Sequence, residues 1–180
     1  IPKEQFLSVD EINANKVAGD IGVGPRFFDA WVTHQKNEPD KLYVVIEMEK
    51  LEGVTLSSVI PRNTRNKDER ELKELQNLYK NRNTKYKDGN TYFFDRLFSI
   101  LKMLAENKIS WTDAHYGNFI HPDGRVSFGG ELKIIDFDSS KLHESVSDAA
   151  KAILVAPYIK VWTDMFDKLP ENYKGKTATE

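Results

Sequence analysis

Hydrophobic residues recur at helical spacing in three parts of the chain. Between Thr91 and Asn107, apolar side chains return every three or four residues, which predicts a helix with one buried face. A second apolar helix is predicted over Ser147–Phe166, broken or kinked near Pro157. A shorter helix is predicted to start at a capping box formed by Ser8 and Glu11 and to run to about Ala18. The buried face of the first of these helices is predicted to carry Phe94, Leu97, Phe98, Leu101, Leu104 and Ala105.

Strand-like segments lie between these helices. The aromatic stretch Arg26–Thr33 predicts one strand, and the polar stretch His34–Lys41 predicts a hairpin loop after it. Leu42–Met48 is apolar at nearly every position, which predicts a strand buried on both faces. A second hairpin is predicted from Phe119-Ile120 and Leu132–Phe137, with a longer tip between them.

One long segment has a different composition. From Pro61 to Asn90, Arg and Lys alternate with Asn, Asp and Glu, and large apolar residues are sparse. We expect a solvated insert, with a helix at Asp68–Tyr79 and a loop at Asn81–Asn90. A protein-docking role for this insert is the alternative. The polar tail from Glu171 is expected to fray.

Composition narrows the function classes. A length of 180 residues fits one compact domain or a domain and a half. The net charge of -2 lacks the basic excess of a nucleic-acid binder. With no cysteine, disulfides, thiolate metal sites and cysteine nucleophiles are excluded, which suits the cytoplasm. No apolar stretch is long enough to span a membrane. Because the chain begins at Ile1 rather than Met, we expect a longer natural protein.

Three polar residues lie at the edges of apolar segments. Asp113 and Asn118 follow the long predicted helix, and Asp136 follows a run of aliphatic residues. A carboxylate between Ile135 and Phe137 is costly to bury unless it is paired or holds a cation. Carboxylate and amide oxygens suit Mg²⁺, so the pattern predicts a magnesium site.

The order D-x-x-x-x-N, hairpin, D-F resembles the catalytic core of the protein-kinase-like superfamily. The resemblance implies that Asp113 is catalytic and that Asn118 and Asp136 hold Mg²⁺ on the phosphates of ATP. It also implies an α+β, protein-kinase-like two-lobe fold with a truncated N-terminal lobe and an abbreviated, mostly helical C-terminal lobe. Residues 1–49 would form the partial N-terminal lobe. Residues 50–180 would form the hinge and the reduced C-terminal lobe, with the polar insert at 61–90.

The segment Met48–Leu56, with the sequence M-E-K-L-E-G-V-T-L, resembles a kinase hinge. By that resemblance Met48 is the gatekeeper, and Ile120 forms part of the adenine floor. Glu11, followed by Gly24-Pro25, resembles the glutamate of the kinase αC helix, although a capping-box role explains it equally well. The backbone expected to meet adenine is that of Glu49, Lys50 and Leu51.

Departures from the usual kinase pattern point to an atypical member. Trp111-Thr112 replaces H-R before the catalytic Asp, and Asp138 replaces the glycine of D-F-G. His115 replaces the usual lysine and is placed with the catalytic residues, on the substrate side or in a structural role. The motif is nearer to those of haspin, aminoglycoside phosphotransferases and small secreted bacterial effector kinases. His34, His121 and His143 are expected to be exposed.

The front of the predicted nucleotide site is incomplete in this sequence. It has no Gly-rich phosphate loop, and no lysine pairs with Glu11 unless Lys3 supplies it. These parts either lie upstream of Ile1 or are missing. We therefore expect an ATP-dependent kinase acting on a hydroxyl of a protein substrate, similar to serine/threonine kinases, in the cytoplasm or in a host cytoplasm if it is a secreted effector. The alternatives are a pseudokinase that binds a protein partner and, below it, a small-molecule phosphotransferase.

Overall fold

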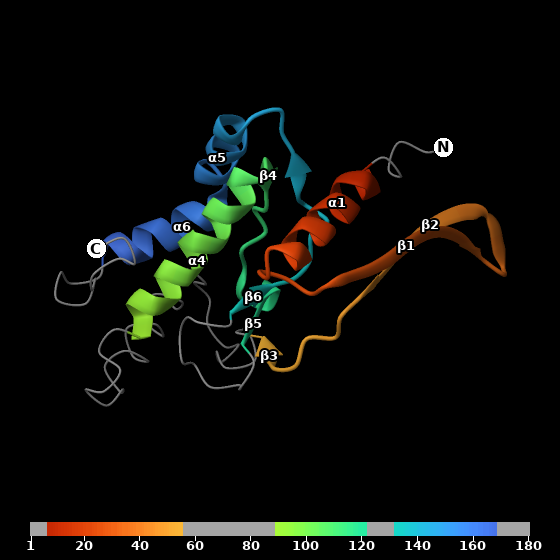
Figure 1. Ribbon diagram of the computed structural model, residues 1–180, viewed down its shortest axis with the longest axis horizontal. Coiled ribbons are helices and arrows are strands. Elements are labelled where there is room, and N and C mark those ends of the chain that lie inside the picture. Colours follow the sequence, from red (N-terminus) through yellow and green to blue (C-terminus); the bar gives the residue numbers. More distant parts are fainter. Residues whose placement is uncertain (1–6, 56–88, 122–131, 169–180) are drawn as a thin grey trace, which may run out of the picture.

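The computed structural model describes residues 7–55, 89–121 and 132–168, and these residues form a mixed α+β fold (Figure 1). The predicted α+β class is therefore confirmed. Helices and small antiparallel sheets alternate along the described chain. The helix predicted at Asp68–Tyr79, the tip of the second hairpin and the tail from Glu171 lie outside the described residues.

Three of the four α-helices in the described residues pack together in one part of the molecule, and the predictions for them are confirmed (Figure 1). Helix α4 covers Gly89–Glu106, so the predicted loop at Asn81–Asn90 ends inside its first turn. Helix α5 covers Val146–Leu154, and α6 covers Pro157–Asp167 with its proline at the start. The chain breaks at this proline because it cannot donate a backbone hydrogen bond within a continuing helix. In α5, the Ser145 side chain caps the first turn by accepting from the Asp148 amide.

Aromatic side chains join these helices to the sheet. Trp162 of α6 meets Phe94 of α4 and Phe119 edge-on, with ring centroids 6.1 Å and 5.9 Å apart. Trp111 meets the other side of this core through Phe119 at 5.6 Å. Each edge-on pair of this kind stabilises the fold by about 0.5–1.5 kcal/mol beyond the contribution of the buried area. The predicted assignment of Trp162 to the core is confirmed, because this side chain is almost fully buried.

The small sheets carry the segments that contain the predicted site. Strand β5, Phe119–His121, lies between β3, Val54–Thr55, and β6, Lys133–Ile134. The pairing of β5 with β6 confirms the second predicted hairpin. Strand β4, Ile109–Ser110, pairs with β7, Lys141–Leu142. The segments that follow β4 and β6 meet, since the Trp111 indole donates to the Asp136 carbonyl oxygen.

Helix α1 covers Leu7–Asp20, so it includes Ser8. The predicted N-cap at Ser8 is therefore wrong, because the helix begins before this residue. After the helix the chain folds back closely, and a Cβ at Gly19 would lie 2.6 Å from the carbonyl oxygen of Pro25. The Val23 carbonyl then accepts a hydrogen bond from the Ile134 amide at 2.9 Å, which ties this turn to β6.

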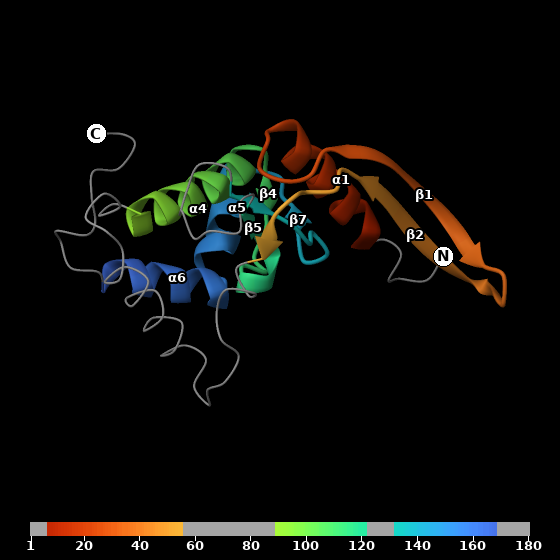
Figure 2. The ribbon, with the colours of Figure 1, turned by 90° about the horizontal axis from the view of Figure 1, so that it is seen from below.

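Strands β1, Phe27–Gln35, and β2, Glu38–Met48, form a two-stranded ribbon that extends away from the helices (Figure 2). Both strands are longer than predicted, and the turn between them is correspondingly shorter than His34–Lys41. The prediction that Leu42–Met48 is buried on both faces is wrong, since no residue of β2 is fully buried. Burial on both faces requires a layer on each side, and the described residues supply none along most of the ribbon.

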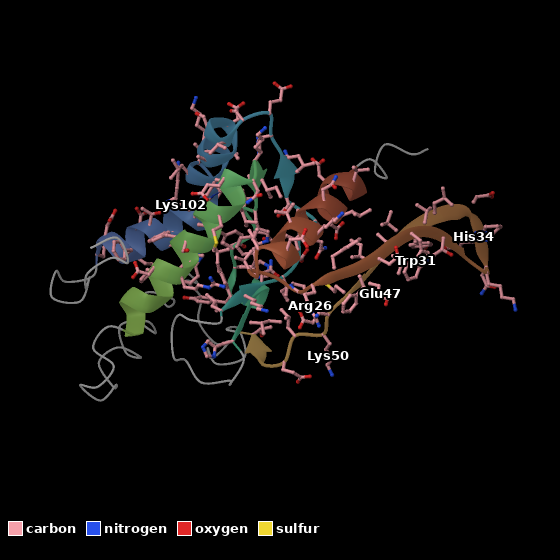
Figure 3. The ribbon with its side chains drawn as sticks, viewed as in Figure 1. Arg26, Trp31, His34, Glu47, Lys50 and Lys102 are labelled. Atoms are coloured by element: carbon pink, nitrogen blue, oxygen red, sulfur yellow. The ribbon has the colours of Figure 1, made fainter. Side chains whose placement is uncertain are left out.

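Two of the three histidines expected to be exposed are not. His121 is buried at the end of β5. His143 is half-buried, and its Nε2 lies 2.7 Å from the Ser110 hydroxyl oxygen. The burial of His121 and the contact of His143 with Ser110 depend on tertiary structure, which a polar sequence context does not reveal. His34, on the ribbon, is exposed as predicted (Figure 3). Within the described residues, no helix is both long enough and apolar enough to cross a bilayer.

Candidate functional site

Asp113 and Asn118 are held together by the short loop that follows β4. A 3₁₀ turn at Tyr116–Asn118 brings the buried Asn118 amide back toward Asp113. The Asn118 Nδ2 donates to the Asp113 carbonyl oxygen at 2.8 Å and to its carboxylate Oδ2 at 3.0 Å. Because both bonds use the amide nitrogen, the amide oxygen of Asn118 is the atom that could bind a cation.

His115 lies beside the same carboxylate. Its Nδ1 accepts a hydrogen bond from the Gly117 amide at 3.0 Å, so this nitrogen carries no proton. The neutral ring therefore carries its proton on Nε2, which lies 3.5 Å from Asp113 Oδ2. His115, which the resemblance placed with the catalytic residues, thus lies where its Nε2 could orient the Asp113 carboxylate.

Asp136 follows β6 in an unusual backbone conformation. Its φ angle is +65°, in the left-handed region, which costs a residue other than glycine on the order of 1–3 kcal/mol. The Ile135 amide donates to the Asn118 carbonyl oxygen at 3.0 Å, and Phe137 is buried, so both neighbours are fixed. The expectation that Asp136 is buried between these neighbours is wrong, because its side chain is exposed. The left-handed conformation of Asp136 interrupts the alternation of buried and exposed side chains that a continuing strand would have.

Asp138 joins this group, and the sequence did not single it out as a ligand. Carboxylate oxygens of Asp113, Asp136 and Asp138 all lie within 4.8 Å of one another. A hydrogen bond with the Asp136 carboxylate raises the pKa of Asp138, and partial burial and the charge of Asp136 raise it further. The signal available in the sequence was the acidic third residue of D-F-D, where the usual motif has glycine.

Glu11 of α1 faces the same acidic group. Burial raises the pKa of Glu11, and the charges of Asp138 and Asp136 add to the shift. With Ser8 inside the helix, the capping-box explanation of Glu11 no longer holds. Among the described residues no cation forms an ion pair with Glu11. Glu11 therefore lies near enough to Asp136 and Asp138 for their charges to act on it, but it does not belong to the cluster of three carboxylates.

The predicted hinge leaves the ribbon at its base (Figure 3). The Glu49 amide donates to the Arg26 carbonyl oxygen at 2.8 Å, and the Glu49 carboxylate accepts from the Arg26 amide at 3.1 Å. The bond from the Arg26 amide, together with the Arg26 charge, holds the pKa of Glu49 below its usual range. Met48, the predicted gatekeeper, lies opposite Phe27 and is 39% exposed. The Glu49 amide is thus already used within the protein.

The rest of the predicted hinge leads toward β5. Lys50 is exposed and Leu51 is half-buried, and the chain then enters β3. In β3, Thr55 lies opposite the half-buried Ile120 of β5. The structure therefore pairs Ile120, the predicted adenine floor, directly with the end of the predicted hinge segment. The polar insert at 61–90 lies almost entirely outside the described residues.

The donor set of this site suits a hard divalent cation. Three carboxylates and the Asn118 amide oxygen offer only oxygen ligands, which Mg²⁺ and Mn²⁺ prefer. Burial is the main cause of the raised pKa of Glu11, and the hydrogen bond with Asp136 is the main cause of the raised pKa of Asp138; neighbouring negative charge adds to both shifts, and a bound cation would offset that part. The residues present therefore fit a metal ion. No protein-family model matches the chain, and no curated protein matches its sequence significantly.

The raised pKa values predict a pH-dependent stability. Asp138 and Glu11 bind a proton more tightly in the folded than in the unfolded chain, so their contribution is present at low pH and is lost as pH rises through their folded pKa values. Asp138→Asn should remove part of this loss of folding stability at high pH, because asparagine does not ionise. The melting temperature of the variant, relative to wild type, should therefore increase between about pH 4 and about pH 7.

The measurement is thermal unfolding of both proteins across this range without metal. The lowered pKa of Glu49 acts in the opposite direction but is common to both proteins, so the difference isolates the acidic group. Addition of Mn²⁺ should raise the melting temperature of wild type more at the upper end of the range than at the lower end. A difference between the proteins that does not change with pH would contradict the prediction.

Proposed function

We propose that the protein is an atypical ATP-dependent protein kinase that transfers the γ-phosphate to a hydroxyl of a protein substrate. The observation that carries the proposal is the convergence of Asp113, Asn118 and Asp136 from two separate loops. These residues were selected from their sequence pattern alone. Their proximity requires the hairpin of β5 and β6 between the loops.

The placement of Glu11 supports the same proposal independently. This residue lies on the first helix, far from Asp136 in the sequence, yet the two carboxylates interact. In the proposed kinase-like arrangement, a glutamate on this helix faces the metal-binding aspartate and receives a lysine. The accumulated negative charge of Glu11, Asp136 and Asp138 provides a place for such a cation, or for a metal ion.

In this proposal each residue has a separate task. Bound Mg²⁺ would neutralise charge on the transferring phosphoryl group. Asp136, Asp138 and the Asn118 amide oxygen would hold the ion. The Asp113 carboxylate would accept the proton of the acceptor hydroxyl and align that hydroxyl for in-line attack. His115 would fix the Asp113 carboxylate through its Nε2 proton, and the 3₁₀ turn would keep Asn118 in register.

Nucleotide would lie between the hinge and β5. Because the Glu49 amide is used by Arg26, a donor for adenine would have to come from further along, at Leu51. Ile120 would then contact the base from β5. Neither the contact at Leu51 nor the contact at Ile120 would involve residues of β1 or β2.

The experiment that tests the proposal is transfer of label from γ-labelled ATP by the intact protein. Autophosphorylation and two unrelated acceptors, casein and a histone mixture, should be assayed with Mg²⁺ and with excess EDTA. We expect transfer that requires the metal. Binding of Mg-ATP without transfer to any acceptor would favour the pseudokinase alternative, and absence of both binding and transfer would refute the proposal.

A further inference from the structure

Trp111 lies two residues before Asp113, where the sequence departs from the usual kinase motif, and it is fully buried. Its indole Nε1–H donates to the carbonyl oxygen of Asp136 at 2.8 Å. The ring is itself fixed, because it packs edge-on against Phe119 with centroids 5.6 Å apart. Trp111, which follows β4, therefore provides a rigid donor to the backbone of Asp136, which follows β6.

The residue that receives this bond is the one in the left-handed conformation. Asp136 has a φ angle of +65°, which persists only where the surroundings determine it. Its neighbours are anchored on each side, by the bond from the Ile135 amide to Asn118 and by the burial of Phe137. The Trp111 bond fixes the carbonyl of Asp136 itself, and with it the peptide plane that follows.

We propose that Trp111 is a positioning residue, which holds Asp136 in its left-handed conformation and so directs the Asp136 carboxylate toward Asp113 and Asp138. The inference rests on the metal site of the proposed function. It assigns a role to the residue that replaces histidine in the usual motif, where the sequence alone suggested altered chemistry. A purely structural role for Trp111 would affect stability without affecting the metal.

The test is Mn²⁺ binding, measured from the loss of the free-ion electron paramagnetic resonance signal, on the intact chain. Trp111→Phe keeps an aromatic ring but removes the donor. Replacement of Trp111 by β-(3-benzothienyl)alanine keeps the bicyclic shape and exchanges only the N–H group for sulfur. Loss of a residue that orients a metal ligand typically weakens metal affinity about 10–100-fold, so both variants should lose at least roughly tenfold.

The matched control is Trp162→Phe. Trp162 is also buried, and its Nε1–H also donates to a backbone carbonyl, that of Ala114, at 2.7 Å. We expect this variant to lose thermal stability like Trp111→Phe but to bind Mn²⁺ more tightly than the Trp111 variants, because its bond does not hold the backbone of Asp136. In addition, the Trp111 variants should reach the same Mn²⁺ occupancy as wild type at a higher Mn²⁺ concentration, because their defect is in affinity.

The possible outcomes separate this inference from the proposed function. Wild-type affinity in both Trp111 variants would overturn the positioning role while leaving the metal site in place. Absence of Mn²⁺ binding by wild type would overturn both. Metal affinity that depends on Trp111, in a protein that transfers no phosphate, would support the positioning role and refute the kinase activity.

Discussion

Asp136→Ala is expected to abolish binding of Mg-ATP while leaving the fold intact. The side chain is exposed, so its removal takes no group out of the core. Its carboxylate is one of the three whose oxygens lie within 4.8 Å of one another, and without it the remaining pair lacks the ligand that the proposal places on the phosphate-bound metal. Isothermal titration calorimetry with Mg-ATP should show binding by wild type and none by the variant.

The backbone at this position calls for a second variant. Alanine at a φ angle of +65° is strained by about 1–2 kcal/mol, whereas asparagine tolerates the left-handed region. Asp136→Asn therefore removes the charge without the strain. Like Asp136→Ala, this variant should show no binding of Mg-ATP. Asp20→Ala, which removes an exposed carboxylate from the end of α1, should bind as wild type does. Equal binding by wild type and both Asp136 variants would remove the metal-site assignment.

The sequence predicted helices more accurately than it predicted burial. The apolar spacing within α4 defines a face, and Phe94, Leu97 and Leu101 are buried as that spacing requires. In β2 the apolar run was equally clear, yet the strand is mostly exposed. A helix face is a local property, whereas burial of a strand depends on layers contributed by other segments.

Within the candidate site, residue types were predictable but backbone conformation was not. Asp113 and Asn118 were predictable because they follow the long helix in the pattern D-x-x-x-x-N, and the structure adds the bonds that join them. The exposure of Asp136 and the participation of Asp138 both follow from the left-handed turn at Asp136. The carbonyl of Asp136 accepts a hydrogen bond from Trp111, which is distant in sequence, so no local pattern signals this contact.

Asp113→Asn is expected to slow phosphate transfer at least roughly a hundredfold while binding Mg-ATP nearly as well as wild type, because general-base effects are typically about 10²–10⁴-fold. The substitution preserves shape. With its amide oxygen in the place of Oδ2, the new side chain can still accept from Asn118 and face His115. It cannot take a proton from the acceptor hydroxyl. The transfer rate at saturating Mg-ATP, measured beside the calorimetric affinity, separates these two effects.

A companion variant tests whether the neighbouring imidazole acts through the same carboxylate. In His115→Asn the short amide oxygen can replace Nδ1 as acceptor for Gly117, so the turn is kept, but nothing reaches Asp113 in place of Nε2. Its transfer rate should fall less than that of Asp113→Asn, because the proton acceptor remains and only its orientation is loosened. If wild type transfers phosphate no faster than Asp113→Asn on every acceptor, although it binds Mg-ATP, then Asp113 is not a catalytic base and the protein acts by binding alone.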